Sequence, residues 1–421
     1  MSEKINAPRG TKDVLPSESY KWQYVEQILR ETAAQYSHTE IRFPTFEHTE
    51  LFLRGVGDTT DVVSKEMYTF EDKGGRSITL RPEGTASVVR SFIENSLYAG
   101  PLPVKCYYIA PNFRYEKPQA GRLREHHQFG AEVFGSYDPL ADAELLSLAS
   151  TFIKRLGITN VPLYINSIGC AKCRPDYHKA LKEYFADKTE NLCHNCVQRL
   201  EKNPLRVLDC KSPVCSEIGA DAPSIIDYIC SECDDHFTKL QSYLGQMDIE
   251  FTINPRIVRG LDYYTNTVFE FVADCIGSQA AICAGGRYNG LVGQLGGADM
   301  AGLGFGSGIE RLLMVMEAQG VEIPVPQGID IFIAALGDSA VSATTGLVHK
   351  LRQASIRAER DLLGRSLKAQ MKYADKTGVV YTTVLGDDEV QTGEIKVKNM
   401  ATGETQTIEL SPDALINFIK K

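Results

Sequence analysis

The sequence contains no long apolar run and no internal repeat. No stretch approaches the about 18 consecutive apolar residues that a membrane-spanning helix needs, so we predict no contact with a membrane. The first residues, Met1 to Pro8, are polar and lack the apolar segment of a secretory signal. Because the chain combines eleven cysteines with no such signal, we expect it in the reducing cytoplasm, where metal ligation or buried thiols are more common than disulfides.

Positive charge is also in short supply. The chain has 45 lysines and arginines against 54 aspartates and glutamates, a formal charge of −9. This balance argues against a protein that coats nucleic acid without specificity, although it leaves room for a local basic face. One such stretch is Lys350 to Lys376, with eight basic and three acidic residues. By charge alone it is either a solvated helix face or a contact for a polyanion.

The usual glycine-rich phosphate-binding loops are absent. There is no G-x-x-x-x-G-K-[ST], and the segment GFGSG at Gly304–Gly308 is not a G-x-G-x-x-G between a strand and a helix. If the protein binds a nucleotide, arginines must therefore hold its phosphates, because a planar guanidinium can grip two phosphate oxygens at once. Arg114, Arg259 and Arg311 stand beside apolar or glycine-rich stretches, where such a role is plausible.

A domain boundary is indicated near residue 325. The segment from Ile323 to Gly328 holds two prolines and a glycine, which interrupt both helices and strands. After it, the stretches IDIFIAAL and GVVYTTVLG read as buried strands, and SAVSATTGLVHKLRQAS reads as a helix. The sequence therefore predicts a large first domain over residues 1–325 and a small α/β domain over residues 328–421.

The first part of the chain has a different pattern. Apolar residues from Tyr20 to Tyr36 recur at helical spacing, with Trp22, Val25, Ile28, Leu29, Ala33 and Tyr36 on one face. The stretches VKCYYIAPNFRYE and HHQFGAEVFG read as two strands that flank a polar, glycine-containing segment. This arrangement is typical of an antiparallel hairpin with a long loop, and it predicts an α+β domain built on an antiparallel sheet.

Eight of the eleven cysteines lie between Cys170 and Cys233. They form the pairs Cys170/Cys173, Cys193/Cys196, Cys210/Cys215 and Cys230/Cys233, with nineteen residues between the first two pairs and fourteen between the last two. Taken in chain order, each half approximates the C-x2-C-x15–20-C-x2-C spacing of a tetrahedral zinc site. We predict a helical cysteine-rich insertion over residues 168–250 that holds structural zinc, one ion or two; the alternative is a reduced insertion without metal. The remaining Cys106, Cys275 and Cys283 are expected to be small core residues in strands.

Several motifs together resemble those of a known family. Phe113-Arg-Tyr-Glu116 and Gly302-Leu-Gly-Phe-Gly-Ser-Gly-Ile-Glu-Arg311 are similar to motifs 2 and 3 of class II aminoacyl-tRNA synthetases, and Pro44 with the segment after it is compatible with the weaker motif 1. The stretches PRGTKDVLP, TLRPEGTASVVR, RGLDYYTNTVFEF, AGGRYNGL and GRSLKAQMKYADKTGV narrow the resemblance to the histidyl-tRNA synthetase family over essentially the whole chain.

The resemblance implies a site and roles for its residues. It assigns catalysis to Arg114 and Arg259, histidine binding to Glu83, Thr85, Gln128, Glu132, Tyr263, Tyr264 and Tyr288, and ATP binding to Arg114, Glu116, Arg122, His126, Arg259 and Arg311. His126 departs from the family, because many relatives have there a phenylalanine that stacks on adenine. An imidazole can also stack, so we expect the activity to survive and only the stacking partner to differ.

The resemblance further implies a reaction and its partners. Histidine would be activated with ATP and Mg²⁺ to histidyl-adenylate and pyrophosphate, and then transferred to the 3′ end of tRNA(His) by a homodimer. The motif 2 loop, with Lys117, Arg122 and Arg124, would meet the acceptor end of the tRNA, and Lys350 to Lys376 would meet the anticodon arm. Two alternatives are a regulatory subunit of ATP phosphoribosyltransferase, which binds histidine without forming the adenylate, and a zinc-dependent nucleic-acid-binding protein without catalysis. The regulatory subunit typically lacks the C-terminal domain and the motif arginines, whereas both are present here.

Overall fold

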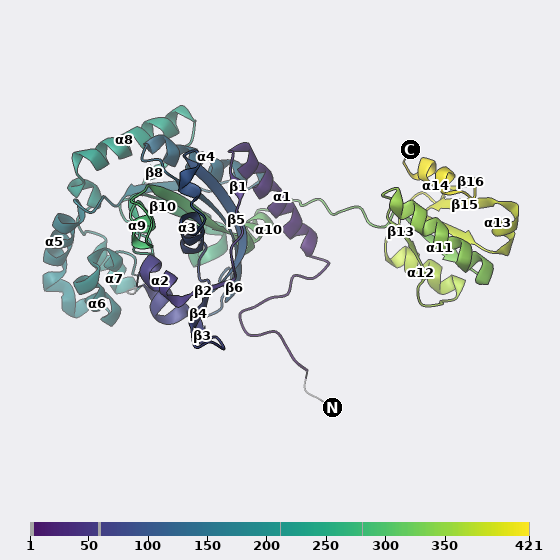
Figure 1. The fold of residues 1–421 in the computed structure, drawn as a ribbon, viewed down its shortest axis with the longest axis horizontal. Helices are drawn as coiled ribbons and strands as arrows, with labels where there is room; N and C mark the ends of the chain where they lie inside the picture. The colour runs from purple at the N-terminus through teal and green to yellow at the C-terminus, as the bar shows by residue number, and fades with distance from the viewer. Residues whose placement is uncertain (1–3, 58–59, 211, 280, 421) are drawn as a thin grey trace. The chain divides into compact units, whose positions relative to one another are not determined.

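The computed structural model describes residues 4–57, 60–210, 212–279 and 281–420. It consists of two compact units, Met1–Ile323 and Pro324–Lys421, which are described separately here (Figure 1). The predicted polar start of the chain, Met1 to Pro8, lies partly outside the described residues. Within the part of the chain that the structure describes, no helix is both long and apolar enough to cross a membrane.

The first unit is built on an eight-stranded sheet with the order β1-β5-β6-β11-β10-β9-β7-β8. Its strands are β1 (Thr39–Glu40), β5 (Val104–Phe113), β6 (Glu125–Phe134), β7 (Leu163–Ser167), β8 (Thr252–Ile253), β9 (Thr265–Val272), β10 (Ala281–Arg287) and β11 (Gly302–Gly308). The strands from β5 to β7 pair antiparallel, and only the outermost pairs β1/β5 and β7/β8 are parallel. The predicted hairpin is confirmed, since β5 pairs antiparallel with β6 from Val104 opposite Phe134 to Phe113 opposite Glu125.

One face of this sheet carries the main core. Side chains of a strand alternate between the two faces, so Phe129, Ala131 and Val133 of β6 point to the same side. Helices α1 (Ser19–Gln35), α4 (Pro139–Arg155), α8 (Ser231–Gln246) and α10 (Ile309–Ala318) contribute apolar residues to the same core. The predicted first helix is confirmed, with Val25 and Leu29 fully buried in this cluster and Trp22 packed against it. The opposite face of the sheet carries the candidate site residues Gln128 and Glu132 of β6.

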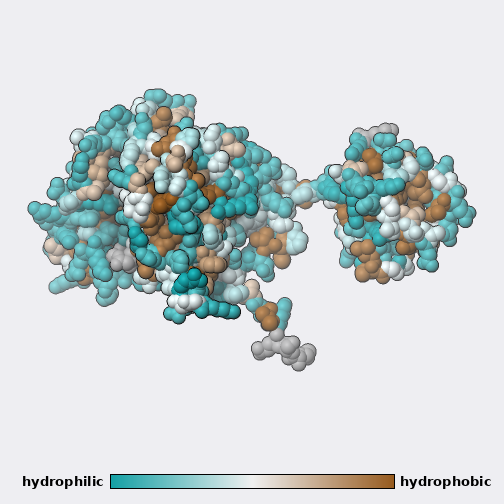
Figure 2. Space-filling view, viewed as in Figure 1, coloured by the Kyte–Doolittle hydropathy of each residue, from teal (hydrophilic) through white to brown (hydrophobic). Residues whose placement is uncertain are grey.

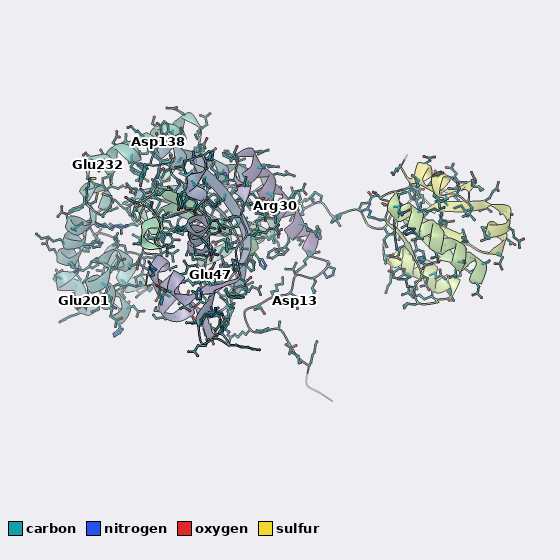
Figure 3. All side chains as sticks on the ribbon, in the orientation of Figure 1. Asp13, Arg30, Glu47, Asp138, Glu201 and Glu232 are labelled. Carbon is teal, nitrogen blue, oxygen red and sulfur yellow. The ribbon has the colours of Figure 1, made fainter. Side chains whose placement is uncertain are left out.

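A small sheet and two helices lie near that opposite face. The strands β2 (Phe46–His48), β4 (Ser77–Leu80) and β3 (Tyr68–Glu71) pair in this order, and the helices are α2 (Thr49–Val56) and α3 (Thr85–Glu94), with the short α9 (Leu291–Gln294) beside them. Arg90 of α3 and Glu47 of β2 form an ion pair at 2.7 Å, and Figure 3 labels Glu47 in this region. The pair ties α3 to the small sheet.

The connection between β7 and β8 is a helical insertion. It contains α5 (Arg174–Phe185), α6 (His194–Lys202), α7 (Pro213–Gly219) and α8, joined by short turns such as η4 (Pro204–Val207). Because β7 and β8 are parallel neighbours, the chain must cross over between them, and the whole insertion forms that crossover. All eight clustered cysteines lie in it or at its start.

The three scattered cysteines do not behave alike. Cys106 in β5 and Cys283 in β10 are buried in the core, as predicted. The prediction for Cys275 is wrong, because this residue is exposed in the turn Asp274–Gln279, between β9 and β10. Its apolar neighbours continue the strand pattern in sequence, but the chain leaves the sheet after Val272.

The second unit is a small α/β domain. Its sheet has the order β13-β12-β14-β15-β16, with β12 parallel to β13 and β14 and the other pairs antiparallel. The elements are β12 (Ile331–Ala335), α11 (Asp338–Gln353), β13 (Ala358–Arg360), α12 (Leu367–Lys376), β14 (Tyr381–Leu385), α13 (Asp387–Thr392), β15 (Glu394–Asn399), β16 (Thr405–Glu409) and α14 (Pro412–Ile419). The two strands and the helix predicted in this part of the chain are thus confirmed. Figure 2 shows polar residues over most of the visible surface of each unit.

Candidate active site

Glycines on every second residue of β11 make room for the site. Gly302, Gly304, Gly306 and Gly308 share one face of the strand, because side-chain positions alternate. A Cβ atom on Gly304 would lie only 1.7 Å from Oε2 of Glu132, and one on Gly306 would lie 2.0 Å from Nε2 of Gln128. Side chains from the neighbouring strand β6 thus lie directly over the β11 backbone. The glycine-rich stretch is the floor of a polar site.

Glu132 is the most deeply buried acid of this site. Its side chain is completely buried, and its carboxylate accepts hydrogen bonds from Oγ1 of Thr85 at 2.9 Å and from the hydroxyl of Tyr288. Burial raises the pKa of Glu132 to about 8, and the two hydrogen bonds only partly oppose this effect. The site therefore holds a buried acid that binds its proton more tightly than an ordinary glutamate does.

Glu83 lies at the start of α3. Its carboxylate accepts hydrogen bonds from the backbone N–H groups of Thr85 at 2.9 Å and Ala86 at 2.7 Å, which have no partner within the helix. Burial raises the pKa of Glu83, while these bonds and the charge of Arg114 act in the opposite direction. The local sequence fixes this carboxylate in place, beside the cluster around Glu132.

The third polar residue of this face, Gln128, is oriented by its neighbours. Its Oε1 accepts hydrogen bonds from Nδ2 of Asn112 at 2.9 Å and from the hydroxyl of Tyr108 at 3.3 Å. The amide Nε2 is therefore turned toward Gly306 and the open side of the sheet.

Three tyrosines form an aromatic cluster beside these polar residues. The ring centroid of Tyr263 lies 4.7 Å from that of Tyr264 and 5.7 Å from that of Tyr288. The structure thus brings the residues predicted for histidine binding to one face of the sheet.

The residues predicted for ATP binding line a single cavity of about 490 Å³. Its walls include Arg114, Glu116, Arg122, His126, Arg259 and Arg311, together with Gln128. A larger cavity of about 810 Å³ also reaches Glu310, but none of the candidate residues is among the described residues that line it. Convergent charged groups, and not size, mark the smaller cavity as the site.

Each arginine of the cavity is held by a partner. Nε of Arg114 donates to the carbonyl of Pro82 at 2.7 Å. Arg311 donates to the carbonyls of Gly121 and Ala281 at 3.0 and 2.7 Å. In the same cavity, Arg122 pairs with Glu116 at 2.6 Å and Arg259 pairs with Glu270. The guanidinium groups are thereby oriented before any ligand arrives, which lowers the reorganisation that binding requires.

His126 lies in the same cavity, at the β6 position opposite Asn112. Burial and the nearby charges of Arg114 and Arg311 lower the pKa of His126 to about 3. The ring is therefore neutral at physiological pH. A neutral aromatic ring can stack on a base, so the prediction that His126 stacks on adenine remains a prediction.

Several residues of the site were not predicted from the sequence. Glu270, the partner of Arg259, is a single acid in the apolar strand β9, and this departure from the pattern could have identified it. Tyr108 and Asn112 orient Gln128, but in the sequence they cannot be told from core residues of β5. Gly10 contributes a backbone contact, because its carbonyl accepts from the N–H of Arg124 at 2.7 Å. No local signal reveals such a long-range contact.

The cysteines form two groups of four, but not in the predicted order. The outer centre consists of Cys170, Cys173, Cys230 and Cys233, and the inner centre of Cys193, Cys196, Cys210 and Cys215. The prediction that consecutive pairs share a site is therefore wrong. The first pair directly precedes α5, while Cys230 precedes α8 and Cys233 lies in the first turn of α8. These positions meet where the insertion closes on itself, so the first pair meets the last.

The geometry of both centres fits a metal ion. In each group the four sulfur atoms lie within 4.8 Å of one another, and Sγ–Sγ distances such as Cys170–Cys173 and Cys193–Cys210 are 3.6 and 3.8 Å. A tetrahedron with metal–sulfur bonds of about 2.3 Å has edges of about 3.8 Å. Backbone N–H groups also donate to the sulfurs, as from Cys193 to Cys215 at 3.2 Å. These are the surroundings expected of thiolate ligands.

The antiparallel sheet, the glycine-floored site on β11 and the arginine-lined cavity define the catalytic domain of a class II aminoacyl-tRNA synthetase. The sequence model of the histidyl-tRNA synthetase family matches residues 10–312, and that of an anticodon binding domain matches residues 330–421. The chain therefore belongs to the histidyl-tRNA synthetase family, whose members are aminoacyl-tRNA ligases that use ATP to join histidine to tRNA. The fold class and the activity predicted from the sequence are thus confirmed.

Individual relatives agree with this assignment. A histidine–tRNA ligase of Caldanaerobacter subterraneus subsp. tengcongensis is 56% identical over 402 residues, which cover 96% of each chain. A crystal structure of apo histidyl-tRNA synthetase from S. aureus superposes with a TM-score of 0.85 at 41% identity, covering 99% of this chain and 100% of that one. A Bacillus halodurans structure named as an ATP phosphoribosyltransferase regulatory subunit/histidyl-tRNA synthetase has a TM-score of 0.65 at 21% identity and shows only that the fold is shared.

Proposed function

We propose that the cavity of Arg114, Arg259 and Arg311 and the adjoining Glu132 cluster form the site where this chain makes histidyl-adenylate and charges tRNA(His). One observation carries the proposal: four arginines and Gln128 line one cavity, and Gln128 lies over the same glycine face of β11 as the buried Glu132. The arginines suit a triphosphate, and the polar residues around Glu132 suit a small polar amino acid. This arrangement also disfavours a purely regulatory role, for which a cluster of phosphate-binding arginines is not needed.

In the first step, a carboxylate oxygen of histidine attacks the α-phosphorus of ATP. The bond from this phosphorus to the bridging oxygen breaks, and pyrophosphate leaves with the electron pair. The nucleophile is already ionised at neutral pH, so no protein base is needed. Arg114 and Arg259 neutralise charge on the α-phosphate, and Arg311 contacts the adenine or the terminal phosphates. The neutral ring of His126 stacks on the base.

Mg²⁺ accompanies the ATP. The carboxylates of Glu116 and Glu310 line the cavity and would provide oxygen ligands of the kind that this ion prefers. When bound, the ion supplies further neutralisation of phosphate charge. The arginines keep their role as oriented donors, since they are fixed by Pro82, Gly121 and Ala281 through backbone carbonyls.

The amino-acid pocket reads both ends of histidine. Glu83 and Gln128 contact the ammonium and carboxylate groups together with Thr85, and Glu132 with Tyr264 contacts the imidazole, with Tyr263 and Tyr288 beside them. A buried acceptor such as Glu132 disfavours an analogue that lacks the ring N–H, because the carboxylate would then lose one donor and keep only Thr85 and Tyr288. In the second step, a ribose hydroxyl at the 3′ end of the tRNA attacks the activated carbonyl, and AMP leaves.

The remaining parts of the chain serve the tRNA. Residues 1–325 form the catalytic core, the motif 2 loop with Lys117 meets the acceptor end, and residues 328–421 bind the anticodon arm. Within the stretch from Lys350 to Lys376, Arg352, Arg357 and Arg365 pair with acids of their own domain. The lysines of α12, Lys368, Lys372 and Lys376, are therefore the better candidates for phosphate contacts. The active protein is a homodimer, as the family resemblance implies. It acts in the cytoplasm, where ribosomes use its product, the charged tRNA.

Residues 168–250 form an insertion stabilised by structural zinc. The cysteine geometry supports one ion in each centre. The insertion has an apolar core around Tyr177, Leu181 and Phe185, and thiolate–zinc bonds would add cross-links between its distant segments.

Substitution of Arg259 tests the assignment of the cavity. We expect Arg259→His to lower the rate of single-turnover adenylate formation by two or more orders of magnitude, with a smaller change in the dissociation constant of histidine, because the lost contact belongs to the transition state. Rapid-quench measurement with labelled ATP gives the rate, and fluorescence titration gives the affinity. A wild-type rate in this variant would show that the cavity has another role.

A further inference from the structure

The segment that carries Arg259 and the paired tyrosines has no regular secondary structure of its own. Residues 259–264, here called the Arg259 loop, precede β9 without helix or strand hydrogen bonds. Backbone carbonyls in such a segment need partners from elsewhere, since an unpaired polar group in a buried place is costly. The structure provides these partners from two places, and both are next to a cysteine centre.

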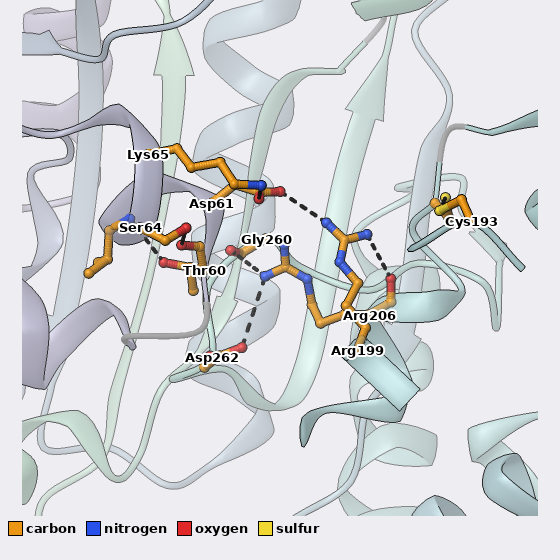
Figure 4. A network of polar contacts seen from close by, with 11 residues as sticks. Thr60, Asp61, Ser64, Lys65, Cys193, Arg199, Arg206, Gly260 and Asp262 are labelled. Atoms are coloured by element: carbon orange, nitrogen blue, oxygen red, sulfur yellow. Dashed lines mark hydrogen bonds and ion pairs between the residues drawn. The ribbon is translucent and has the colours of Figure 1, made fainter. Parts of the chain in front are cut away.

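The first set of partners comes from residues that lie between the cysteines of the inner centre. Arg206 donates to the carbonyl of Gly260, directly after Arg259, at 2.7 Å and approaches Asp262 at 3.9 Å. Asn203 donates to the same aspartate at 3.0 Å. Both donors lie between Cys196 and Cys210, in the part of the chain that the inner centre closes into a loop. Figure 4 shows the contacts of Arg206 with Gly260 and Asp262 and the neighbouring pair of Arg199 with Asp61.

The second set of partners comes from the outer centre and the residues next to it. Arg174, which follows Cys173 directly, donates to the carbonyl of Tyr264. Asn266 donates through Nδ2 to Sγ of Cys233 at 3.3 Å and through its backbone N–H to the carbonyl of Gly169 at 2.9 Å. The end of the Arg259 loop is thus fixed by residues that adjoin both halves of the outer centre.

The two sets enclose the loop from both ends. Arg206 is almost completely buried, so its guanidinium depends on the contacts with Gly260 and Asp262. Arg174, Arg206, Arg259 and Tyr264 also line one cavity of about 30 Å³, which has room for about one water molecule. The side chains that hold the loop and two side chains that the loop carries therefore face the same small cavity.

We propose that the two zinc-loaded cysteine centres act as a clamp on the Arg259 loop, and that Arg206 and Arg174 are positioning residues for adenylate formation. Neither of these two arginines contacts the substrate. They fix the backbone on each side of Tyr263 and thereby fix the guanidinium of Arg259. The rate measurements that test this inference assume the proposed function. The inference itself adds that zinc in the insertion controls the geometry of the catalytic site.

The first test compares Arg206→Ala, Arg206→Lys and the control Arg256→Ala in the full-length zinc-loaded protein. Arg256 also donates to two backbone carbonyls, those of Ala220 and Ala222, but it does not contact the Arg259 loop. We expect Arg206→Ala to lower kcat of histidine-dependent pyrophosphate exchange by about 10- to 100-fold, with KM for ATP and histidine changed by less than about threefold. Lysine should restore part of the rate, since it keeps one donor to Gly260, and the control should stay near the wild type.

A wild-type kcat in Arg206→Ala, or an equal loss in Arg256→Ala, would overturn the clamp. If the wild type itself shows no exchange, the proposed function fails, and a second measurement then decides the clamp on its own. Zinc is quantified per chain by elemental mass spectrometry and removed with a chelator, and hydrogen–deuterium exchange is followed in peptides that cover residues 259–266. We expect about two zinc ions per chain and faster exchange in these peptides after their removal, with peptides of β5 and β6 unchanged. Unchanged exchange at residues 259–266 after zinc loss, or a protein purified without zinc, would contradict the proposal.

Discussion

The roles of single residues here depend on burial as much as on chemical type. Glu83 and Glu132 are both glutamates that, in a sequence, look like partners for salt bridges. In the structure neither has an arginine or lysine as its main partner; Glu83 is held by backbone N–H groups and Glu132 by hydroxyl groups. Burial without a paired cation raises the pKa of both groups. Such groups are typical of sites that bind or discriminate ligands.

The raised pKa of Glu132 predicts how stability depends on pH. Its value of about 8 in the folded protein lies above the ordinary 4.5 of the unfolded chain, so between these pH values the folded state binds the proton more tightly. The free energy of unfolding should therefore fall as pH rises from about 4.5 to about 8, by at most about 1.4 kcal/mol per pH unit from this group. Urea unfolding of the wild type and Glu132→Gln between pH 5 and 8 measures the difference.

The amide that replaces the carboxylate in this variant cannot ionise. The free energy of unfolding of the wild type should therefore fall relative to that of the variant as pH rises toward 8. Parallel pH profiles would show that Glu132 is ionised throughout. The same variant should weaken discrimination of histidine more than affinity for ATP, because Glu132 belongs to the amino-acid pocket and not to the phosphate cavity. Equal losses for the two substrates would count against this assignment.

At the scale of elements, strand β11 shows how a backbone creates a site. Replacement of Gly304 by alanine would place a Cβ atom 1.7 Å from the Glu132 carboxylate and 2.7 Å from the carbonyl of Ala131. We expect Gly304→Ala to raise KM for histidine at least tenfold and to cost about 1–3 kcal/mol of stability, because neither neighbour can move without leaving its partners. Gly293→Ala in α9 is the matched control, since nothing lies within 4 Å of its added methyl group. Steady-state kinetics and thermal unfolding of both variants decide; equal behaviour would contradict the role of β11 as the floor of the site.

Elements with a clear period could be predicted from the sequence. The helix Ser19–Gln35 and the hairpin of β5 and β6 follow from apolar spacing and alternation. What could not be predicted depends on contacts between distant residues. The pairing of Cys170 and Cys173 with Cys230 and Cys233 is set by the way the insertion folds back, while spacing along the chain favours consecutive pairs. The exposure of Cys275 has a similar cause, because an apolar sequence does not reveal where a strand leaves its sheet.

At the scale of the whole molecule, the two units predict separable effects on the two steps. Every candidate residue for adenylate formation lies before Ile323, and the second unit has its own apolar core. A protein truncated before residue 328 should therefore still form histidyl-adenylate, while charging of tRNA(His) should fall at least 100-fold. The salt dependence of the residual charging should be weaker, since phosphate contacts have been lost. Loss of both steps in parallel, in a soluble truncated protein, would show instead that the second unit maintains the active assembly.

A finer variant locates the polyanion contact within the second unit. Lys368, Lys372 and Lys376 recur at four-residue spacing on α12, so they share one side of the helix. Glutamate at all three positions should raise KM for tRNA(His) at least tenfold and leave pyrophosphate exchange unchanged. Arg357→Gln is a useful comparison, because Arg357 pairs with Asp330 inside the domain and should affect stability more than tRNA binding. An unaltered KM for tRNA in the triple variant would place the contact elsewhere.

The central claim is that the arginine cavity and the Glu132 pocket together activate histidine. The most direct test is ATP–pyrophosphate exchange by the purified full-length protein, measured with each of the common amino acids in turn. We expect exchange with histidine and at least about a thousandfold less with any other amino acid, since the pocket pairs a buried carboxylate with the imidazole N–H. Binding of histidine without any exchange, or comparable exchange with an amino acid that lacks this ring, would contradict it.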